Sequence, residues 1–268
     1  MYKLIALDID GTTFNDEHKI SNEVRESLFY AVNKGVKVVF ISGREEFTIK
    51  KILKELNLDT YYSALNGSII STTYSEKAVV VNGLNNEYVF EILEKIENSN
   101  LIPIIFLQDE IFTKNIDDKY LDIVSNFINP KILRVDDLKE YIIKNNLKND
   151  ILKIGICNEY DVLKNLETNL IQNFKDEYTV SFSLPFFLEI MAKNVDKGYA
   201  LKSICEINDI SLSKTIAMGD GENDIPMLKI CGLSVGMGNA MDNVRKVSKY
   251  ITDTNQNDGV AKAIRKFI

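Results

Sequence analysis

Two pairs of acidic residues follow apolar stretches of the chain. Asp8 and Asp10 come at the end of the apolar run from Lys3 to Ile9, and Asp220 and Asp224 follow the run from Thr215 to Met218. If both runs are neighbouring parallel strands, the two pairs meet at the carboxyl edge of one sheet. Clustered carboxylates repel each other unless a cation lies between them. The sequence therefore predicts a site for a hard divalent ion, Mg²⁺, although a plain polar turn would also use Asp-Ile-Asp-Gly-Thr.

Two further segments carry groups suited to binding phosphate. Ser42-Gly43-Arg44 follows a second apolar run and offers a hydroxyl and backbone amides, and Lys197 stands at the start of a predicted helix. A helix N-terminus favours anions over cations, so Lys197 needs a separate negative partner there. The alternatives are an ordinary helix N-cap for Ser42, a solvated surface charge for Lys197, and an N-cap role for Asp224 before Pro226.

The elements that position these residues alternate between strand and helix in the first and last thirds of the chain. Continuously apolar runs indicate strands buried on both faces, and apolar residues at helical spacing indicate helices. Strands are predicted at residues 3–9, 36–41, 187–191, 215–218, 233–235 and 250–251, with helices at 22–33, 45–56, 198–208, 226–230 and 239–247. This order predicts an α/β fold with one doubly wound parallel sheet built from both ends of the chain.

The middle of the chain has a different pattern and is predicted to be an inserted α/β domain. Helices are expected at 87–97, 119–127 and 161–174, and strands at 102–106, 151–157 and 178–182. The predicted division is a core of residues 1–82 and 186–268 and an insert of 83–185. Phe112, Phe127, Phe174, Phe182 and Phe186 are expected to belong mainly to its hydrophobic core, and no residue of the insert is assigned to substrate binding.

Taken in order, these motifs resemble the haloacid-dehalogenase-like (HAD) phosphatases, specifically the Cof subfamily of sugar-phosphatase-like hydrolases with a large α/β cap. The four motifs that carry the resemblance are Asp8-Ile9-Asp10-Gly11-Thr12, Ser42-Gly43-Arg44, Lys197-Gly198, and Gly219-Asp220 with Asn223-Asp224. Asn66-Gly67 and Gly238-Asn239-Ala240 resemble two further segments of the subfamily. Thr13 and Ser68 depart from its usual residues without touching the catalytic groups. The resemblance covers essentially the whole chain and implies a Rossmannoid core with a cap.

The resemblance also implies a mechanism. Asp8 would attack phosphorus, and Asp10 would protonate the leaving oxygen and then activate water to hydrolyse the aspartyl phosphate. Mg²⁺ would be held by the Asp8 carboxylate, the Asp10 backbone carbonyl and Asp220. The remaining assignments are phosphate binding by Ser42, Lys197, Asn223 and the amides of Ile9 and Gly43, and orientation of these groups by Asp224 and Thr12.

Three other functions fit parts of the pattern. A phosphomutase would use the same core and a similar cap but return the phosphoryl group to the sugar, and a receiver-type phospho-switch would phosphorylate an aspartate without rapid turnover. A dinucleotide site at Gly236–Ala240 would lie near the end of the chain and would lack the full glycine fingerprint with its downstream ribose-binding acid. The insert and the acid cluster favour the hydrolase.

Composition limits the partners. The formal net charge is −7 with a pI near 5.0, and the basic residues form no stripe, so nucleic acid is not expected as a partner. No apolar run reaches the roughly 20 residues of a membrane span, and the first residues resemble a buried strand and not a secretory signal, so a cytoplasmic protein is expected. The three scattered cysteines and the single histidine, His18, predict neither a zinc site nor a histidine-based triad. The expected protein is a monomer acting on a small phosphorylated metabolite, with sugar phosphates as the first choice.

Overall fold

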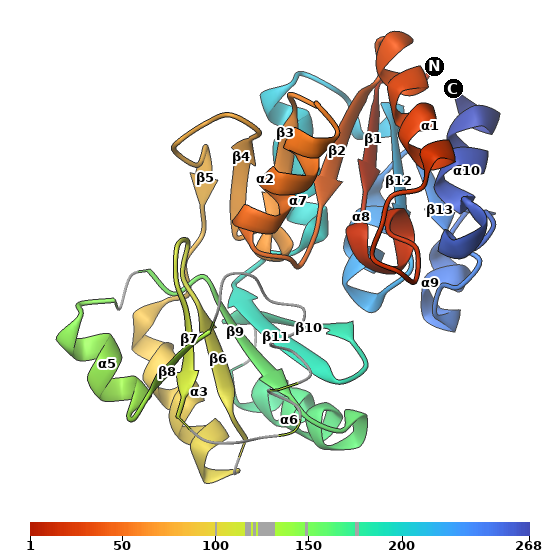
Figure 1. Ribbon diagram of the computed structural model, residues 1–268. Coiled ribbons are helices and arrows are strands. Elements are labelled where there is room, and N and C mark those ends of the chain that lie inside the picture. Colours follow the sequence, from red (N-terminus) through yellow and green to blue (C-terminus); the bar gives the residue numbers. More distant parts are fainter. Residues whose placement is uncertain (100, 116–118, 120–121, 123–131, 148–149, 175–176) are drawn as a thin grey trace.

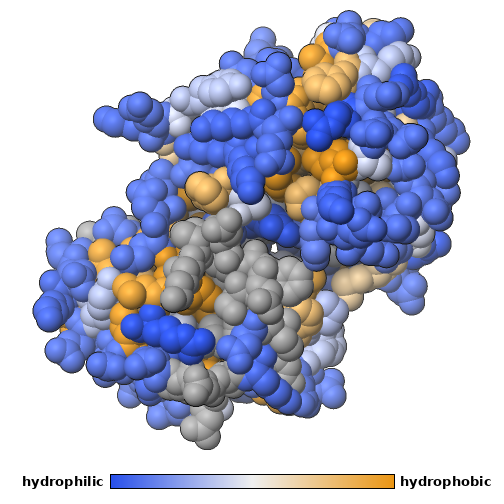
Figure 2. All heavy atoms as spheres, viewed as in Figure 1, coloured by the Kyte–Doolittle hydropathy of each residue, from blue (hydrophilic) through white to orange (hydrophobic). Residues whose placement is uncertain are grey.

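A computed structural model describes residues 1–268 except 100, 116–118, 120–121, 123–131, 148–149 and 175–176. The described chain forms two bodies, each built around its own sheet, and both termini lie in the same body (Figure 1). Hydrophilic side chains cover most of the face shown in Figure 2. Among the described residues, no helix is both long and apolar enough to cross a membrane.

The first sheet is assembled from the two ends of the chain. Its strands are β1 (Leu4–Leu7), β2 (Lys37–Ile41), β3 (Tyr61–Ala64), β4 (Ile69–Thr72), β5 (Val80–Val81), β12 (Thr215–Gly219), β13 (Leu233–Gly236) and β14 (Tyr250–Ile251). They are ordered β14-β13-β12-β1-β2-β3-β4-β5. The strands from β14 to β3 run parallel, whereas β4 and β5 add an antiparallel edge. All four residues of β1 are buried, as expected of a central strand that is covered on both faces.

Helices pack against this sheet. They are α1 (Asn22–Asn33), α2 (Glu46–Glu55), α7 (Lys197–Ile207), α8 (Ile225–Ile230), α9 (Asp242–Val247) and α10 (Gly259–Phe267). The Ser21 hydroxyl caps α1 by accepting a hydrogen bond from the Val24 amide, and Val24, Leu28 and Ala31 bury one side of that helix. α1 packs beside α10, so the two ends of the chain are joined in one body (Figure 1).

The second sheet is mainly antiparallel. Its strands are β6 (Pro103–Phe106), β7 (Ile111–Lys114), β8 (Leu133–Val135), β9 (Lys153–Cys157), β10 (Tyr178–Leu184) and β11 (Phe187–Ala192), in the order β10-β11-β9-β6-β7-β8. Among the described residues, the helices beside it are α3 (Asn86–Asn98), α5 (Leu138–Lys144) and α6 (Tyr160–Asn173). One face of β9 and β11 buries Ile154, Ile156, Leu188 and Ile190 in the core of this second body. The opposite face places Cys157 of β9 and Phe187 of β11, together with Phe106 of β6, in the core that continues into the first body.

The predicted fold class is confirmed, since a parallel-sheet core with helices is joined to a second α/β unit. One strand assignment is wrong. The strand expected at 187–191 in the first sheet forms as β11, but it pairs with β9 and β10 in the second sheet. Its apolar pattern fits either sheet, and the tight connection after β10 makes an antiparallel neighbour the nearer partner. Most of the helix expected at 119–127 lies outside the described residues.

Candidate active site

The groups singled out in the sequence meet at the carboxyl edge of the first sheet. Strands β12, β1, β2 and β3 are consecutive neighbours in that sheet. Asp220 follows β12, Asp8 follows β1, Ser42 follows β2 and Asn66 follows β3 by two residues. The parallel order of these strands therefore brings together segments that are more than 200 residues apart in the sequence.

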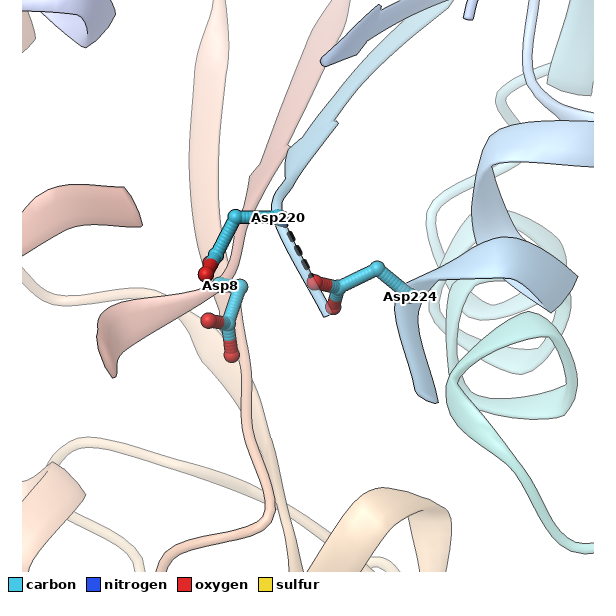
Figure 3. Close-up of side chains that lie close together, drawn as sticks. All are labelled: Asp8, Asp220 and Asp224. Carbon is cyan, nitrogen blue, oxygen red and sulfur yellow. Dashed lines mark hydrogen bonds between the residues drawn. The ribbon is translucent and has the colours of Figure 1, made fainter. Parts of the chain in front are cut away.

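Three carboxylates form the centre of this edge (Figure 3). One oxygen from each of Asp8, Asp220 and Asp224 lies within 4.8 Å of the others. Gly11, with φ +71°, makes the approach possible, because a Cβ there would lie 2.3 Å from an Asp220 Oδ atom. The Thr12 hydroxyl donates a 2.8 Å hydrogen bond to Asp220 Oδ1 and fixes that carboxylate in place.

Lys197 supplies the positive charge of the cluster. It is the first residue of α7 and is 1% exposed, and its Nζ donates to Asp8 Oδ1 at 2.5 Å and to Asp224 Oδ1 at 2.6 Å. These carboxylates are the negative partners that a lysine at a helix N-terminus requires. Burial lowers the pKa of Lys197, but the charges of Asp224 and Asp8 more than offset this and raise it above its ordinary value. Lys197 is therefore a buried, permanently charged ammonium.

Asp224 occupies the N-cap position of α8, yet its side chain does not cap that helix. Instead, Oδ2 accepts a 2.9 Å hydrogen bond from the Asp220 amide (Figure 3) and another of 2.9 Å from the Gly221 amide. Its Oδ1 accepts from Lys197. Asp224 is therefore the N-cap residue before Pro226 that was expected, but its side chain makes no capping hydrogen bond to α8. Asp224 links Lys197 to the loop after β12.

The carboxylates fit a divalent cation. Burial, followed by the neighbouring Asp224, raises the pKa of Asp220 to about 7, and burial raises the pKa of Asp8 despite the attraction of Lys197. Raised pKa values mean that the charged forms lack sufficient positive charge around them. Carboxylate oxygens are the ligands that Mg²⁺ prefers, so Asp8 and Asp220 are suited to hold it, with Asp224 close behind.

This electrostatic arrangement predicts how stability depends on pH. A carboxyl group whose pKa is higher in the folded state keeps a proton that the unfolded chain loses, so without metal the contribution of Asp220 to the free energy of unfolding should fall as pH rises from about 4 to about 7. Added Mg²⁺ should raise the melting temperature more at pH 8 than at pH 5, because metal binding requires the ionised carboxylates. Both effects are measured by thermal unfolding in EDTA and in Mg²⁺ at pH 5 and pH 8. An equal Mg²⁺ effect at pH 5 and pH 8, or an unchanged pH dependence in Asp220→Asn, would contradict the prediction.

Asp10 lies at the mouth of the site and is bound by Arg44. The guanidinium group donates from Nε to Asp10 Oδ2 and from Nη2 to Oδ1, both at 2.6 Å. The imidazole Nδ1 of His18 lies 3.9 Å from Asp10 Oδ1. This bidentate pairing of Arg44 with Asp10 was not predicted, because it depends on the distance between two loops.

Three of the predicted phosphate-binding residues, Ser42, Gly43 and Asn223, line the same cleft as Asp8 and Asp220. Ser42 is 1% exposed, and its Oγ accepts a hydrogen bond from the Arg44 amide at 3.2 Å. The N-cap of α2 is Glu45, so Ser42 is not a helix cap. Asn223, in the turn after Asp220, is buried, and its Nδ2 donates to Asn66 Oδ1 at 3.1 Å. Ile9 is fully buried directly after Asp8, where the chain turns.

A cleft of about 330 Å³ opens from this edge toward the second sheet. The second sheet contributes Phe106, Lys153, Ser183, Leu184, Phe187 and Glu189 to its lining, and Phe186 lies between the last two strands. Phe112, Phe174 and Phe182 are core residues as predicted, whereas Phe186 lines the cleft and Phe127 lies outside the described residues. No residue of the insert was predicted to line this cleft. The signal in the sequence that could have identified such residues was a single charged residue, Lys153 or Glu189, in an otherwise apolar strand.

Comparison with known proteins identifies the family. The model of the haloacid dehalogenase-like hydrolases matches residues 5–264. The 5-amino-6-(5-phospho-D-ribitylamino)uracil phosphatase YcsE of Bacillus subtilis is 33% identical over 99% of this chain and 96% of its own, and phosphatase YwpJ of the same organism is 27% identical over 99% and 100%. The crystal structure of a haloacid dehalogenase-like hydrolase from Bacteroides thetaiotaomicron is 31% identical, covers all of both chains and superposes with a TM-score of 0.85. The chain therefore belongs to the haloacid dehalogenase-like hydrolases.

Proposed function

We propose that this enzyme is a Mg²⁺-dependent phosphatase that hydrolyses small organic phosphate monoesters through an aspartyl phosphate on Asp8. The family and the names of the relatives carry the phosphatase class. The observation that carries the mechanism is the position of Asp8. It is a buried carboxylate directly after a central strand, bonded to a buried lysine and beside Asp220 at the floor of the cleft.

Asp8 attacks the phosphorus atom in line with the leaving oxygen. Mg²⁺, held by Asp8, the Asp10 carbonyl and Asp220, would offset the charge between the attacking carboxylate and the phosphate. Lys197 holds Asp8 in its attacking position through the 2.5 Å hydrogen bond and adds positive potential. Ser42, Asn223 and the amides of Ile9 and Gly43 hold the transferring oxygens, so positioning supplies much of the rate.

Asp10 acts as general acid toward the leaving oxygen and then as general base toward water. In the structure both of its oxygens accept hydrogen bonds from Arg44, so neither is free to contact the leaving group. Asp10 therefore becomes the proton donor only after the Arg44 contact opens. The incoming phosphate ester supplies a competing anion for the guanidinium group at that moment.

The acid role of Asp10 predicts a dependence on the leaving group. Asp10→Asn should lower kcat for a sugar phosphate by about 100-fold or more, because general acid catalysis contributes about 10²–10⁴-fold. The loss in phosphoryl transfer to Asp8 should be much smaller with p-nitrophenyl phosphate, whose leaving oxygen needs no proton. Burst kinetics with both substrates measure this, and Glu17→Gln in the same loop, where Glu17 is exposed, is the control. Equal losses in the transfer step with both substrates would remove the acid role.

The second sheet is proposed as the cap that closes the cleft. The predicted insert of 83–185 is extended by β11, since that strand belongs to the same sheet. The YcsE protein is named for a phosphorylated ribitylamino compound. A phosphorylated sugar or sugar alcohol, alone or attached to a ring, is therefore the proposed class of substrate for this chain.

Phosphate release tests the proposed function. Wild type is incubated with sugar phosphates, a phosphoribityl compound, nucleotides, pyridoxal phosphate and p-nitrophenyl phosphate, in Mg²⁺ or EDTA. Release that requires Mg²⁺ supports the proposal and ranks the substrates. Isomerisation of a sugar phosphate without net phosphate release would instead establish the mutase. A stable phosphoprotein without turnover would establish the switch.

A further inference from the structure

A chain of hydrogen bonds runs from the second sheet to two phosphate-binding positions of the first body. Lys153, the first residue of β9, donates from Nζ to Glu189 Oε1 at 2.5 Å and to the Gly43 carbonyl at 2.9 Å. Glu189 Oε2, on β11, accepts from Asn66 Nδ2 at 2.6 Å. Asn66 Oδ1 then accepts from Asn223 Nδ2 at 3.1 Å. Gly43 and Asn223 are thus joined through two side chains of the second sheet.

These groups are almost completely withdrawn from solvent. Lys153, Glu189 and Asn66 are each 1% exposed, and Asn223 is 7% exposed. The aromatic ring of Phe106 lies 4.1 Å below the Lys153 ammonium. In such surroundings every hydrogen bond of the chain is strong, and a group that lost its partner would be left uncompensated.

The hydrogen bonds of this series can run in only one donor-to-acceptor order. An ionised carboxylate only accepts hydrogen bonds, so Glu189 requires the NH₂ side of the Asn66 amide. Asn66 Oδ1 must then face Asn223, which requires the NH₂ side of that amide in turn. The second hydrogen of Asn223 Nδ2 is left to point elsewhere, and Asn223 lines the cleft. A single charge on β11 therefore sets the orientation of two amides in the first body.

The backbone at Gly43 is fixed at the other end of the chain. Its carbonyl accepts from Lys153, and a Cβ on Gly43 would lie 3.2 Å from Asn66 Oδ1 and 3.5 Å from Glu189 Oε2. The peptide that follows Ser42 is thus packed directly against the same two side chains.

We propose that Lys153 and Glu189 are positioning residues that orient Asn223 and the Gly43 backbone toward the transferred phosphate, so that the phosphate site is complete only when the second sheet is seated. This inference rests on the proposed function. A buried ion pair stabilises a fold no better than apolar side chains that pack well, so stability alone does not explain these charges in two apolar strands. What these charges contribute is the orientation of the Asn66 and Asn223 amides.

The test uses two variants that break the chain at different places. Glu189→Gln keeps the size of the side chain but removes the group that can only accept. Asn66→Gly removes the linking amide and leaves the Lys153–Glu189 pair intact, and glycine tolerates the φ of +55° found there. The control is Thr113→Val, which removes a buried 2.8 Å hydrogen bond to the Pro103 carbonyl in the same sheet, outside the cleft.

Inorganic phosphate binding to the Mg²⁺-loaded protein is measured by calorimetry, together with KM for the best substrate. The Kd for phosphate and the KM should each rise by about tenfold or more in each variant, the size expected for losing a hydrogen bond to a charged oxygen. The double variant should be no more than about twofold worse than either single variant, because both break one chain. Thr113→Val should lower the melting temperature and leave both values unchanged.

Three results would overturn the inference. One such result is a phosphate Kd and a KM within about twofold of wild type in folded Asn66→Gly and Glu189→Gln proteins. It would show that the chain of hydrogen bonds serves stability alone. Effects that multiply in the double variant would show that the residues act separately. If the wild-type enzyme hydrolyses substrate and the variants bind phosphate as tightly as wild type, the positioning role fails and the proposed function stands. A wild type that neither binds nor releases phosphate would overturn both the positioning role and the proposed function.

Discussion

Asp8→Asn is expected to reduce turnover by at least about 10⁴-fold while the protein remains folded. Phosphate monoesters hydrolyse extremely slowly without a catalyst, so an enzyme that loses its nucleophile has no fast alternative route. Asparagine keeps the size of the side chain and can still accept the hydrogen bond from Lys197. Because burial raises the pKa of Asp8, removing its charge also relieves an unfavourable interaction in the metal-free protein. Phosphate release and thermal unfolding measure the two effects.

The comparison requires that the variant be folded. The melting temperature of Asp8→Asn in EDTA should equal or exceed that of wild type at pH 8. Turnover within about tenfold of wild type, a barrier change of only about 1.4 kcal/mol, would exclude Asp8 as the nucleophile.

Lys197→Met is expected to have the largest effect on stability. The ammonium group is the shared partner of Asp8 and Asp224, and all three side chains are buried. Removing one member of a buried charge cluster leaves the others uncompensated, which costs about 3–5 kcal/mol. Urea unfolding in EDTA at pH 8 measures the loss, which should be smaller in Mg²⁺. Activity should be lost as well, because Asp8 would no longer be held in position.

Lys202→Met in the same helix is the matched control. Lys202 pairs with Glu206 at 3.9 Å on the surface of α7, and both side chains are more than half exposed. Such pairs contribute about 0–1 kcal/mol, so this variant should unfold close to wild type. Equal losses in the two variants would mean that α7 itself, and not the buried cluster, is sensitive to the loss of a lysine.

The central elements of the fold could be predicted because local patterns determine them. The apolar run before Asp8 and the helix at 22–33 were both found, since a fully buried strand and a one-sided helix leave clear signatures in the sequence. The meeting of Asp8, Ser42 and Asp220 followed from the rule that the carboxyl ends of parallel strands share an edge. The anionic partners of Lys197 were anticipated from its unfavourable place at a helix N-terminus.

Contacts between residues far apart in the sequence were harder to predict. β11 was predicted as a strand but assigned to the wrong sheet, because Phe187–Ala192 carries no local information on its neighbours. The strands β7 and β8 and the helices α5 and α10 were not predicted. The roles of Lys153 and Glu189 depend on a diagonal contact between two antiparallel strands and on loops of the other body, which no spacing in the sequence reveals.

Chemical trapping of a phosphorylated Asp8 tests the central claim most directly. Asp10→Asn is the protein of choice, because it should form the aspartyl phosphate from p-nitrophenyl phosphate but activate water poorly, so that the intermediate accumulates. Borohydride reduces an acyl phosphate to an alcohol, so the peptide containing residue 8 should carry homoserine when substrate and Mg²⁺ are present. Substrate-free samples and the Asp8→Asn variant should remain unmodified there. Phosphate release from wild type, combined with no modification at residue 8 or with modification at another residue, would contradict the account.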